Sequence, residues 1–189
     1  MSLLSRAVTE LPCGFAQGYG LTETCGGFCY LWPEDMDPRG NERMKSGGHP
    51  FGATEIRIVD ENDVDVAPGQ TGEIVCRSGR VMKGYWKRPD ATAEAMRGGW
   101  FHTGDAGFMA PDGYVHIVDR LKDMVISGGE NIYPAEIEHA LFAHEAVQEC
   151  AVIGVPDDKW GEALLAIIVL RPGKMATETD LQAHLRERL

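Results

Sequence analysis

The sequence predicts an α+β fold in which a distorted antiparallel β part is followed by a small α+β part. Short runs of alternating apolar and polar residues, separated by turn residues, lie between positions 54 and 78, as is typical of antiparallel strands. A densely charged segment, 119–123, is followed by glycines and by a helix start at Pro134. Two apolar runs, 150–155 and 163–170, have the length of strands. Together these features predict two structural parts joined at the charged segment.

The composition is that of an ordinary globular protein, with 189 residues, 43% of them hydrophobic and 25% charged. The formal net charge of −11 repels phosphate backbones, so nucleic acid is excluded as an expected partner. The longest apolar run is too short to span a bilayer, and the N-terminus lacks signal-peptide features, so we expect a cytoplasmic protein without a transmembrane segment. Five cysteines without a CxxC pair indicate reduced thiols rather than disulfides or a zinc site.

The first motif is GYGLTET, at positions 18–24. Its glycines allow the backbone to turn tightly and to lie close to a ligand. Tyr19 offers a flat ring, Thr22 a hydroxyl and Glu23 a carboxylate, and these groups suit a purine, a phosphate oxygen and a divalent cation. A glycine-rich turn with solvated polar residues is an open alternative.

The middle of the chain predicts strands and a short helix. TEIRIVD, beginning at Thr54, and GEIVCRS, beginning at Gly72, are expected to form an antiparallel sheet or a small distorted barrel. KGYWKR, at 83–88, is interpreted as a packed Tyr–Trp pair whose cations reach solvent. A short helix is expected at 89–97, closed by two glycines.

The second motif is WFHTGD, at positions 100–105. The Asp105 carboxylate can accept hydrogen bonds from two neighbouring hydroxyls, the arrangement that a ribose presents. His102 is assigned no chemistry, because a single histidine beside aromatic residues is usually a structural group. A turn at Asp112-Gly113 then leads into a strand at 114–118.

The segment 119–138, DRLKDMVISGGENIYPAEIE, resembles a joint between two domains. Its first five residues hold two acids and two bases, a density that a buried central strand would not tolerate. Ser127-Gly128-Gly129 leaves room for a ligand or another backbone, and Pro134 begins a helix. A loop, a strand and a helix within one domain remain an alternative from spacing alone.

The remaining residues predict a compact α+β unit. We expect a helix from Pro134 to about Val147, followed by two buried strands at the apolar runs. A last helix begins at Thr177, with Asp180 in the capping-box position. His139 and His144 are interpreted as ordinary helix residues, because their spacing does not suit a metal pair.

GYGLTET, WFHTGD and the segment 119–138 occur in the order of three signatures of the adenylate-forming enzymes, which they resemble. This superfamily contains acyl-CoA synthetases, peptide-synthetase adenylation domains and luciferases. ISGGENIYPAEIE and VPDDKWGE look most like fatty-acyl and aryl CoA ligases. The resemblance covers nearly the whole chain but only the last part of such an enzyme. It implies the end of a large AMP-binding domain at 1–120, with a β-barrel-like subdomain at about 47–118, and a truncated small C-terminal domain at 121–189.

The resemblance also implies roles for particular residues. Tyr19 would stack on adenine, Thr22 would bond the α-phosphate and Glu23 would help to hold magnesium. The remaining implied roles are ribose binding by Asp105, a ribose or phosphate contact by Arg120, the hinge at Lys122, and a passage for the pantetheine arm at Ser127, Gly128 and Gly129.

The implied activity is that of an ATP-dependent acyl-CoA ligase, which forms an acyl-AMP from a carboxylic acid and transfers the acyl group to CoA. The resemblance favours a fatty acid as the carboxylic acid, with ATP, Mg²⁺ and CoA as the other reactants. A carrier-protein-loading adenylation domain and a non-catalytic nucleotide- or CoA-binding module are the alternatives. The sequence contains neither the family's Ser/Thr/Gly-rich phosphate loop nor its C-terminal lysine, so this polypeptide alone is expected to be inactive. Uncovered strand edges also favour self-association.

Overall fold

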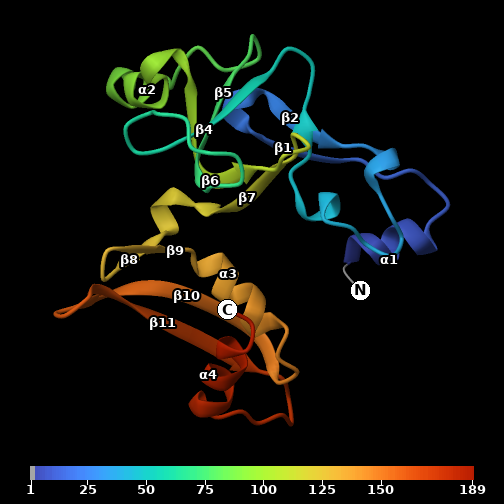
Figure 1. The fold of residues 1–189 in the computed structure, drawn as a ribbon, viewed down its shortest axis with the longest axis vertical. Coiled ribbons are helices and arrows are strands. Elements are labelled where there is room, and N and C mark those ends of the chain that lie inside the picture. The colour runs from blue at the N-terminus through green and yellow to red at the C-terminus, as the bar shows by residue number, and fades with distance from the viewer. Residues whose placement is uncertain (1–2) are drawn as a thin grey trace. The chain divides into compact units, whose positions relative to one another are not determined.

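The computed structural model describes residues 3–189, which divide into two compact units after Ile117 (Figure 1). The sequence placed its domain boundary three residues later, after Arg120. Strand β7 (Val115–Arg120) begins in the first unit and ends in the second. No helix within residues 3–189 has the length and apolar character needed to cross a membrane.

The first unit contains two antiparallel sheets. The three-stranded sheet has the order β1-β2-β3, and the four-stranded sheet has the order β4-β5-β6-β7. The strands other than β7 are β1 (Gln17–Leu21), β2 (Gly26–Leu31), β3 (His49–Pro50), β4 (Glu55–Val59), β5 (Gly72–Arg77) and β6 (Phe101–Met109). The helices are α1 (Leu3–Glu10), α2 (Pro89–Ala95) and the 3-10 turns η1 (Thr22–Thr24), η2 (Pro33–Asp35), η3 (Arg43–Lys45) and η4 (Arg97–Gly99).

The two sheets of the first unit share a core and are joined by a backbone bridge. Gly48 forms an antiparallel bridge with Val115. Only glycine fits at position 48, because φ is +104° and an added Cβ would lie 2.1 Å from the carbonyl carbon of Tyr30. The core residues come from both sheets: Phe28, Cys29, Ile58, Ile74, Cys76, Phe101 and Val115. The antiparallel sheet predicted for TEIRIVD and GEIVCRS is confirmed by the pairing of β4 with β5, whereas the sheet β1-β2-β3 was not predicted.

The second unit is a four-stranded antiparallel sheet with two helices on one face. Its strand order is β10-β11-β8-β9. The elements are η5 (Leu121–Asp123), β8 (Val125–Ser127), β9 (Glu130–Ile132), α3 (Pro134–Phe142), β10 (Val147–Asp157), β11 (Gly161–Leu170) and α4 (Glu178–Arg186). Leu141 of α3 and Leu181 of α4 form a core with Val147 and Val152 of β10. The predicted α+β fold class is confirmed.

The second unit differs from its prediction in two ways. Helix α3 ends at Phe142 rather than near Val147, because the ring of His144 accepts the backbone N–H of Ala146 and turns the chain into β10. Strands β10 and β11 were predicted to be buried, but only one face of each is covered. Ile153 pairs with Leu165, and together with Ile167, which is 53% exposed, they lie on the face opposite the helices.

The packed Tyr–Trp pair predicted at 83–88 was also wrong. Trp86 is 86% exposed, and the backbone of Lys87 has a positive φ of 54°. Of these two aromatic residues, Tyr85 is the one with a side-chain hydrogen bond to another segment. Its hydroxyl donates to Glu23 Oε1, in η1, at 3.0 Å. The turn at Lys87 thus leaves the tryptophan in solvent.

Candidate functional site

Tyr19 and Asp105, one from each of the first two motifs, lie in direct contact. The Tyr19 hydroxyl on β1 donates to Asp105 Oδ2 on β6, with 2.6 Å between the oxygens and 86 residues between the positions in sequence. Asp105 is only 3% exposed, and the Tyr19 ring packs on Phe28 with 4.7 Å between ring centroids. The fold therefore joins the glycine-rich motif and the aspartate motif into one site.

The environment of Tyr19 keeps its hydroxyl protonated. Burial raises the pKa of the phenol well above its ordinary value of 10.0, and the hydrogen bond to Asp105 raises the pKa further. The Tyr19 hydroxyl is therefore a permanent donor to the carboxylate at physiological pH. The hydrogen bond fixes the orientation of the Asp105 carboxylate, because the donor comes from a half-buried side chain on a different strand.

The turn η1 presents the other two polar groups of the first motif. Buried Thr24 holds the turn, because its Oγ1 accepts the N–H of Leu21 at 2.9 Å and lies 2.7 Å from the carbonyl oxygen of Gly26. This arrangement leaves Thr22 exposed and Glu23 half-buried. The Glu23 carboxylate accepts the hydroxyl of Tyr85, as described above.

The second unit contains the charged segment and the predicted hinge. Asp119 ties the end of β7 to the start of α3, since its Oδ1 accepts the N–H of Arg120 at 2.8 Å and its Oδ2 accepts the N–H of Ala135 at 2.9 Å. Lys122 is exposed and lines a cavity of about 390 Å³. Four carboxylates line the same cavity: Asp119, Asp123, Glu138 and Glu162. Lys122 is thus the basic group of an otherwise acidic cavity.

Ser127, Gly128 and Gly129 form the tight turn between β8 and β9. Ser127 pairs with Glu130, and the two glycines have φ values of +61° and +89°. An added Cβ at Gly128 would lie 2.9 Å from the ring of Trp160, and the Gly128 N–H donates to the Trp160 carbonyl at 2.9 Å. Hairpin geometry therefore accounts for both glycines without a ligand.

Two parts of the sequence match models of one family. Residues 1–86 match the AMP-binding enzyme model, and residues 136–189 match the model of the AMP-binding enzyme C-terminal domain. The chain belongs to the AMP-binding enzymes. The resemblance expected from the three motifs is thereby confirmed.

Similar AMP-binding enzymes differ in the carboxylic acid and in the thiol that their names give. A feruloyl-CoA synthase from Amycolatopsis sp is 49% identical over 175 residues, which are 93% of this chain and 35% of that protein. A fatty acid–[acyl-carrier-protein] ligase from Streptomyces coeruleorubidus is 42% identical over 184 residues, which are 97% of this chain and 35% of that protein. The chain thus spans about a third of the length of these relatives.

A solved AMP-binding enzyme has the same fold over nearly the whole chain. The o-succinylbenzoate CoA synthetase of Bacillus subtilis, in complex with an acyl-adenylate intermediate, matches with a TM-score of 0.86 at 37% identity. The match covers 99% of this chain and 37% of the synthetase chain. The same synthetase has been solved with ATP and a magnesium ion.

The turn that follows β1 carries one carboxylate, Glu23, that would suit a magnesium ion held mainly by a nucleotide. No group of three His, Cys, Asp or Glu side chains in the part of the chain that the structure describes could hold a metal. Glu23 supplies one carboxylate, and the exposed Thr22 hydroxyl lies on the same turn. Magnesium in nucleotide enzymes commonly takes one or two carboxylates and completes its shell with phosphate oxygens and water. Glu23 is the residue that would hold such an ion.

Three contacts at the candidate site were missed by sequence reasoning. Thr24 lies within the first motif, and its hydroxyl could have been identified as a turn-former. Tyr85 approaches Glu23 from a distant loop, and Glu73 approaches the second motif from β5. Neither contact has a local sequence signal, because each depends on the pairing of distant segments.

Proposed function

We propose that this chain is part of an ATP-dependent acid–thiol ligase that converts a carboxylic acid to an acyl-AMP and then to a thioester. The observation that carries the proposal is the 2.6 Å hydrogen bond between Tyr19 and Asp105, which unites two motifs in one site. Family membership and the relatives that are CoA ligases support the reaction class.

The residues of the site suit the two halves of a nucleotide. The Asp105 carboxylate would accept the ribose hydroxyls, and the Tyr19 ring would lie against the adenine. The Thr22 hydroxyl would donate to the α-phosphate, and Glu23 would hold magnesium. A carboxylate is a poor electrophile, and transfer of AMP supplies the leaving group that the later attack by a thiol requires.

The second unit would complete each half-reaction by moving about Lys122. One nucleotide site could then serve both half-reactions, because the second unit would swing between two arrangements. Arg120 would add positive charge near the ribose or phosphate where AMP departs. The turn at Ser127, Gly128 and Gly129 would border the path of the pantetheine arm, because it has no bulky side chain.

We propose a fatty acid as the carboxylic acid and CoA as the thiol. The fatty acid–[acyl-carrier-protein] ligase relative supports a fatty acid, while the feruloyl-CoA synthase supports CoA and a different acid. The carrier-protein ligase also favours a second candidate function, in which the acyl group passes to a protein-bound pantetheine thiol.

The test uses the full-length protein that contains this chain. Pyrophosphate release is measured with ATP, magnesium and a panel of short, medium, long-chain and aryl acids, with CoA, with a carrier protein, or with neither. We expect release that depends on an acid, followed by formation of an acyl-CoA. A thioester that forms on the carrier protein but not on CoA would establish the second candidate function. Absence of pyrophosphate release with every acid would contradict both candidate functions. The isolated 189-residue chain is the negative control, for which we expect no pyrophosphate release.

A further inference from the structure

Asp105 lies in an irregular part of β6, where several residues of β6 face one residue of β5. In the pairing of β5 with β6, Val75 pairs with His102 and Glu73 pairs with Ala106. Residues 103–105 therefore face Ile74 alone. Such a bulge bends a strand and changes the direction of its side chains. The orientation of Asp105 depends on what holds this bulge.

Two side chains hold the bulge. The Thr103 hydroxyl donates to the Ile74 carbonyl at 2.6 Å, and the same oxygen accepts the Asp105 N–H at 3.1 Å. Glu73 Oε1 accepts the N–H of Gly104 at 3.1 Å, and Gly104 has a positive φ of 72°. The Glu73 carboxylate thus fixes the residue directly before Asp105.

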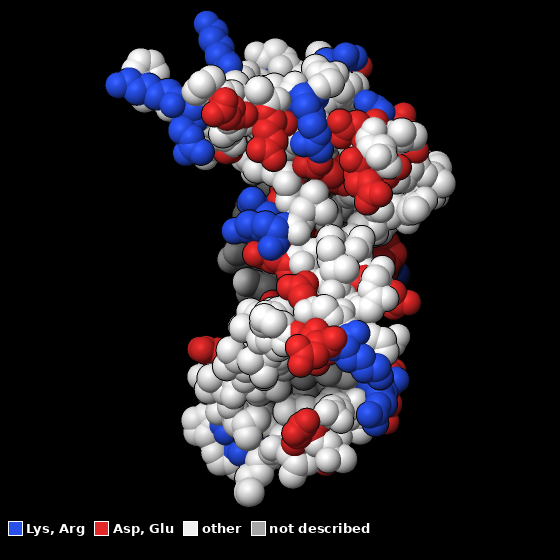
Figure 2. Space-filling model, turned by 90° about the vertical axis from the view of Figure 1, so that its left-hand side faces the viewer, with Lys and Arg blue, Asp and Glu red and all other residues white. Residues whose placement is uncertain are grey.

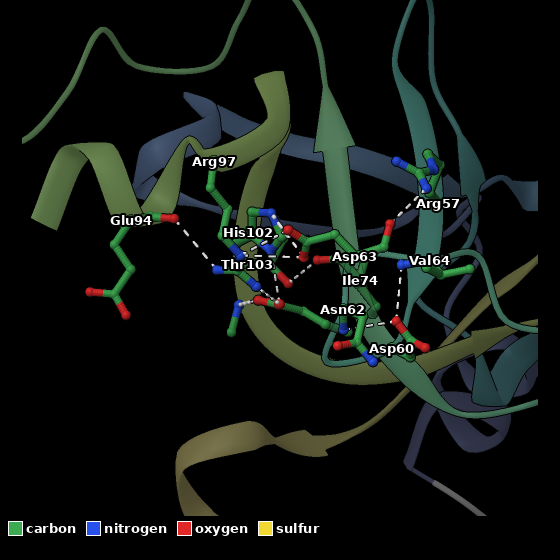
Figure 3. A network of polar contacts seen from close by, with 12 residues as sticks. Arg57, Asp60, Asn62, Asp63, Val64, Ile74, Glu94, Arg97, His102 and Thr103 are labelled. Carbon is green, nitrogen blue, oxygen red and sulfur yellow. Dashed lines mark hydrogen bonds and ion pairs between the residues drawn. The ribbon is translucent and has the colours of Figure 1, made fainter.

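The other oxygen of Glu73 is anchored by two basic side chains. His102 Nδ1 lies 2.8 Å from Glu73 Oε2, and Arg97 Nη2 donates to the same oxygen at 3.0 Å. Arg97 also pairs with Asp63 in the β4–β5 loop at 3.2 Å, and Figure 3 shows Arg97, His102 and Asp63 facing one another. The Glu73 side chain is only 11% exposed, so these contacts leave it little freedom to move.

We propose that Glu73 is a positioning residue for nucleotide binding. Its carboxylate ties the 103–105 bulge to the anchored cluster of Arg97 and His102, and so holds Asp105 toward the vicinal hydroxyls of a ribose. This inference rests on the proposed function, in which Asp105 binds the ribose. Glu73 itself touches no part of the nucleotide in this arrangement.

Glu73→Gln tests the proposal with minimal change in shape. An amide has one acceptor oxygen and one donor nitrogen, so it can no longer accept Gly104 on one side and Arg97 on the other. We measure binding of AMP and of 2′-deoxy-AMP to the full-length protein by calorimetry. Wild type should bind AMP at least about tenfold more tightly, because a site built to bond a hydroxyl rejects the analogue that lacks it. In Glu73→Gln this preference should fall to about threefold or less, as expected when the bonding group is misplaced.

Glu55→Gln is the matched control. Glu55 also lies on a strand of this sheet and pairs with an arginine, Arg77, through both oxygens at 3.0 and 2.7 Å, but it is distant in register from the bulge. This variant should keep the wild-type preference for AMP. In an Asp105→Asn background, Glu73→Gln should cause no further loss of preference, because residues that act through one another are not additive.

The outcomes separate this inference from the proposed function. A wild-type protein that binds neither nucleotide contradicts the proposed function and the inference with it. If wild type prefers AMP over 2′-deoxy-AMP and a folded Glu73→Gln protein shows the same preference, the inference about Glu73 is overturned, but the proposed function is not. If circular dichroism shows that Glu73→Gln is unfolded, Thr103→Val provides the test, since it releases the same bulge without changing a charge, and the same loss of preference is expected.

Discussion

Asp105 keeps a carboxylate almost wholly inside the protein, so each hydrogen bond that it accepts matters for its orientation. Tyr19 supplies one such bond from β1, and burial ensures that the donor keeps its proton. The Tyr19 ring and the Tyr19 hydroxyl thus have separate uses. The ring packs on Phe28 and, under the proposed function, would lie against the adenine, while the hydroxyl holds the Asp105 carboxylate.

Tyr19→Phe should lower the free energy of unfolding by about 1–3 kcal/mol, because it removes a donor from a buried acceptor. Tyr85→Phe is the matched comparison, since it removes a hydroxyl from the more exposed carboxylate of Glu23. Its cost should be below about 1 kcal/mol. Urea denaturation of wild type, Tyr19→Phe and Tyr85→Phe measures both values. An equal cost for the two variants would contradict the view that Tyr19 donates to a buried acceptor.

The same variant should change stability at alkaline pH. The folded protein holds the Tyr19 proton more tightly than the unfolded chain, whose phenol has a pKa near 10.0. The stability that comes from the protonated Tyr19 is fully present below pH 10. It is lost as pH rises above 10, because ionisation of the phenol then lowers the free energy of the unfolded state. Tyr19→Phe should therefore lose less stability than wild type between pH 9 and pH 11. Parallel losses for the two proteins would argue against a buried phenol.

Individual residues were predictable where their chemistry was local. The motifs led to Tyr19 and Asp105 separately, and their residue types suggested a nucleoside. The contact between them was not predictable, because it depends on which strands are neighbours. Glu73 was missed for a similar reason, since the register of β5 against the bulge in β6 leaves no trace in a single sequence.

The β8–β9 hairpin gives a direct test of its two glycines. Both residues have positive φ values, where a side chain costs about 1–2 kcal/mol. Gly129 has open space around it, whereas a Cβ at Gly128 would meet the Trp160 ring at 2.9 Å. Gly128→Ala should therefore destabilise more than Gly129→Ala in chemical denaturation. The reverse order would show that Trp160 moves away without cost.

Elements were predicted better than their environments. The capping box at Thr177 and Asp180 begins α4 as the sequence indicated. The strands β10 and β11 also formed, but a continuous apolar run does not reveal whether one or both faces are covered. Here the helices cover the face that contains Val152, and the face that contains Ile167 stays exposed.

On one face of the protein, basic and acidic side chains are mixed rather than gathered by sign (Figure 2). On the face drawn in Figure 2, Lys and Arg side chains lie among Asp and Glu side chains, with broad uncharged areas between them. The formal net charge is −11, so under the proposed function the anionic nucleotide would have to be bound by specific local groups.

Each of the two units has its own core, which predicts separable effects of core truncation. Ile74→Ala in the first unit and Leu141→Ala in the second each remove a fully buried side chain, at a cost of about 2–5 kcal/mol. Amide hydrogen exchange should accelerate mainly within residues 1–117 for Ile74→Ala and mainly within 118–189 for Leu141→Ala. Equal acceleration throughout the chain for both variants would show a single cooperative unit.

The buried cysteines make the chain its own reporter of unfolding. Burial raises the pKa of Cys29 to about 12 and that of Cys76 to about 11, so both thiols stay protonated and shielded in the folded first unit. Cys150 is half-buried in the second unit, and burial raises its pKa as well. An alkylating pulse at neutral pH would therefore leave Cys29 and Cys76 unmodified until the first unit opens, while the half-buried Cys150 should react faster once the second unit opens. Mass spectrometry of the modified peptides would then time the opening of each unit without any introduced label.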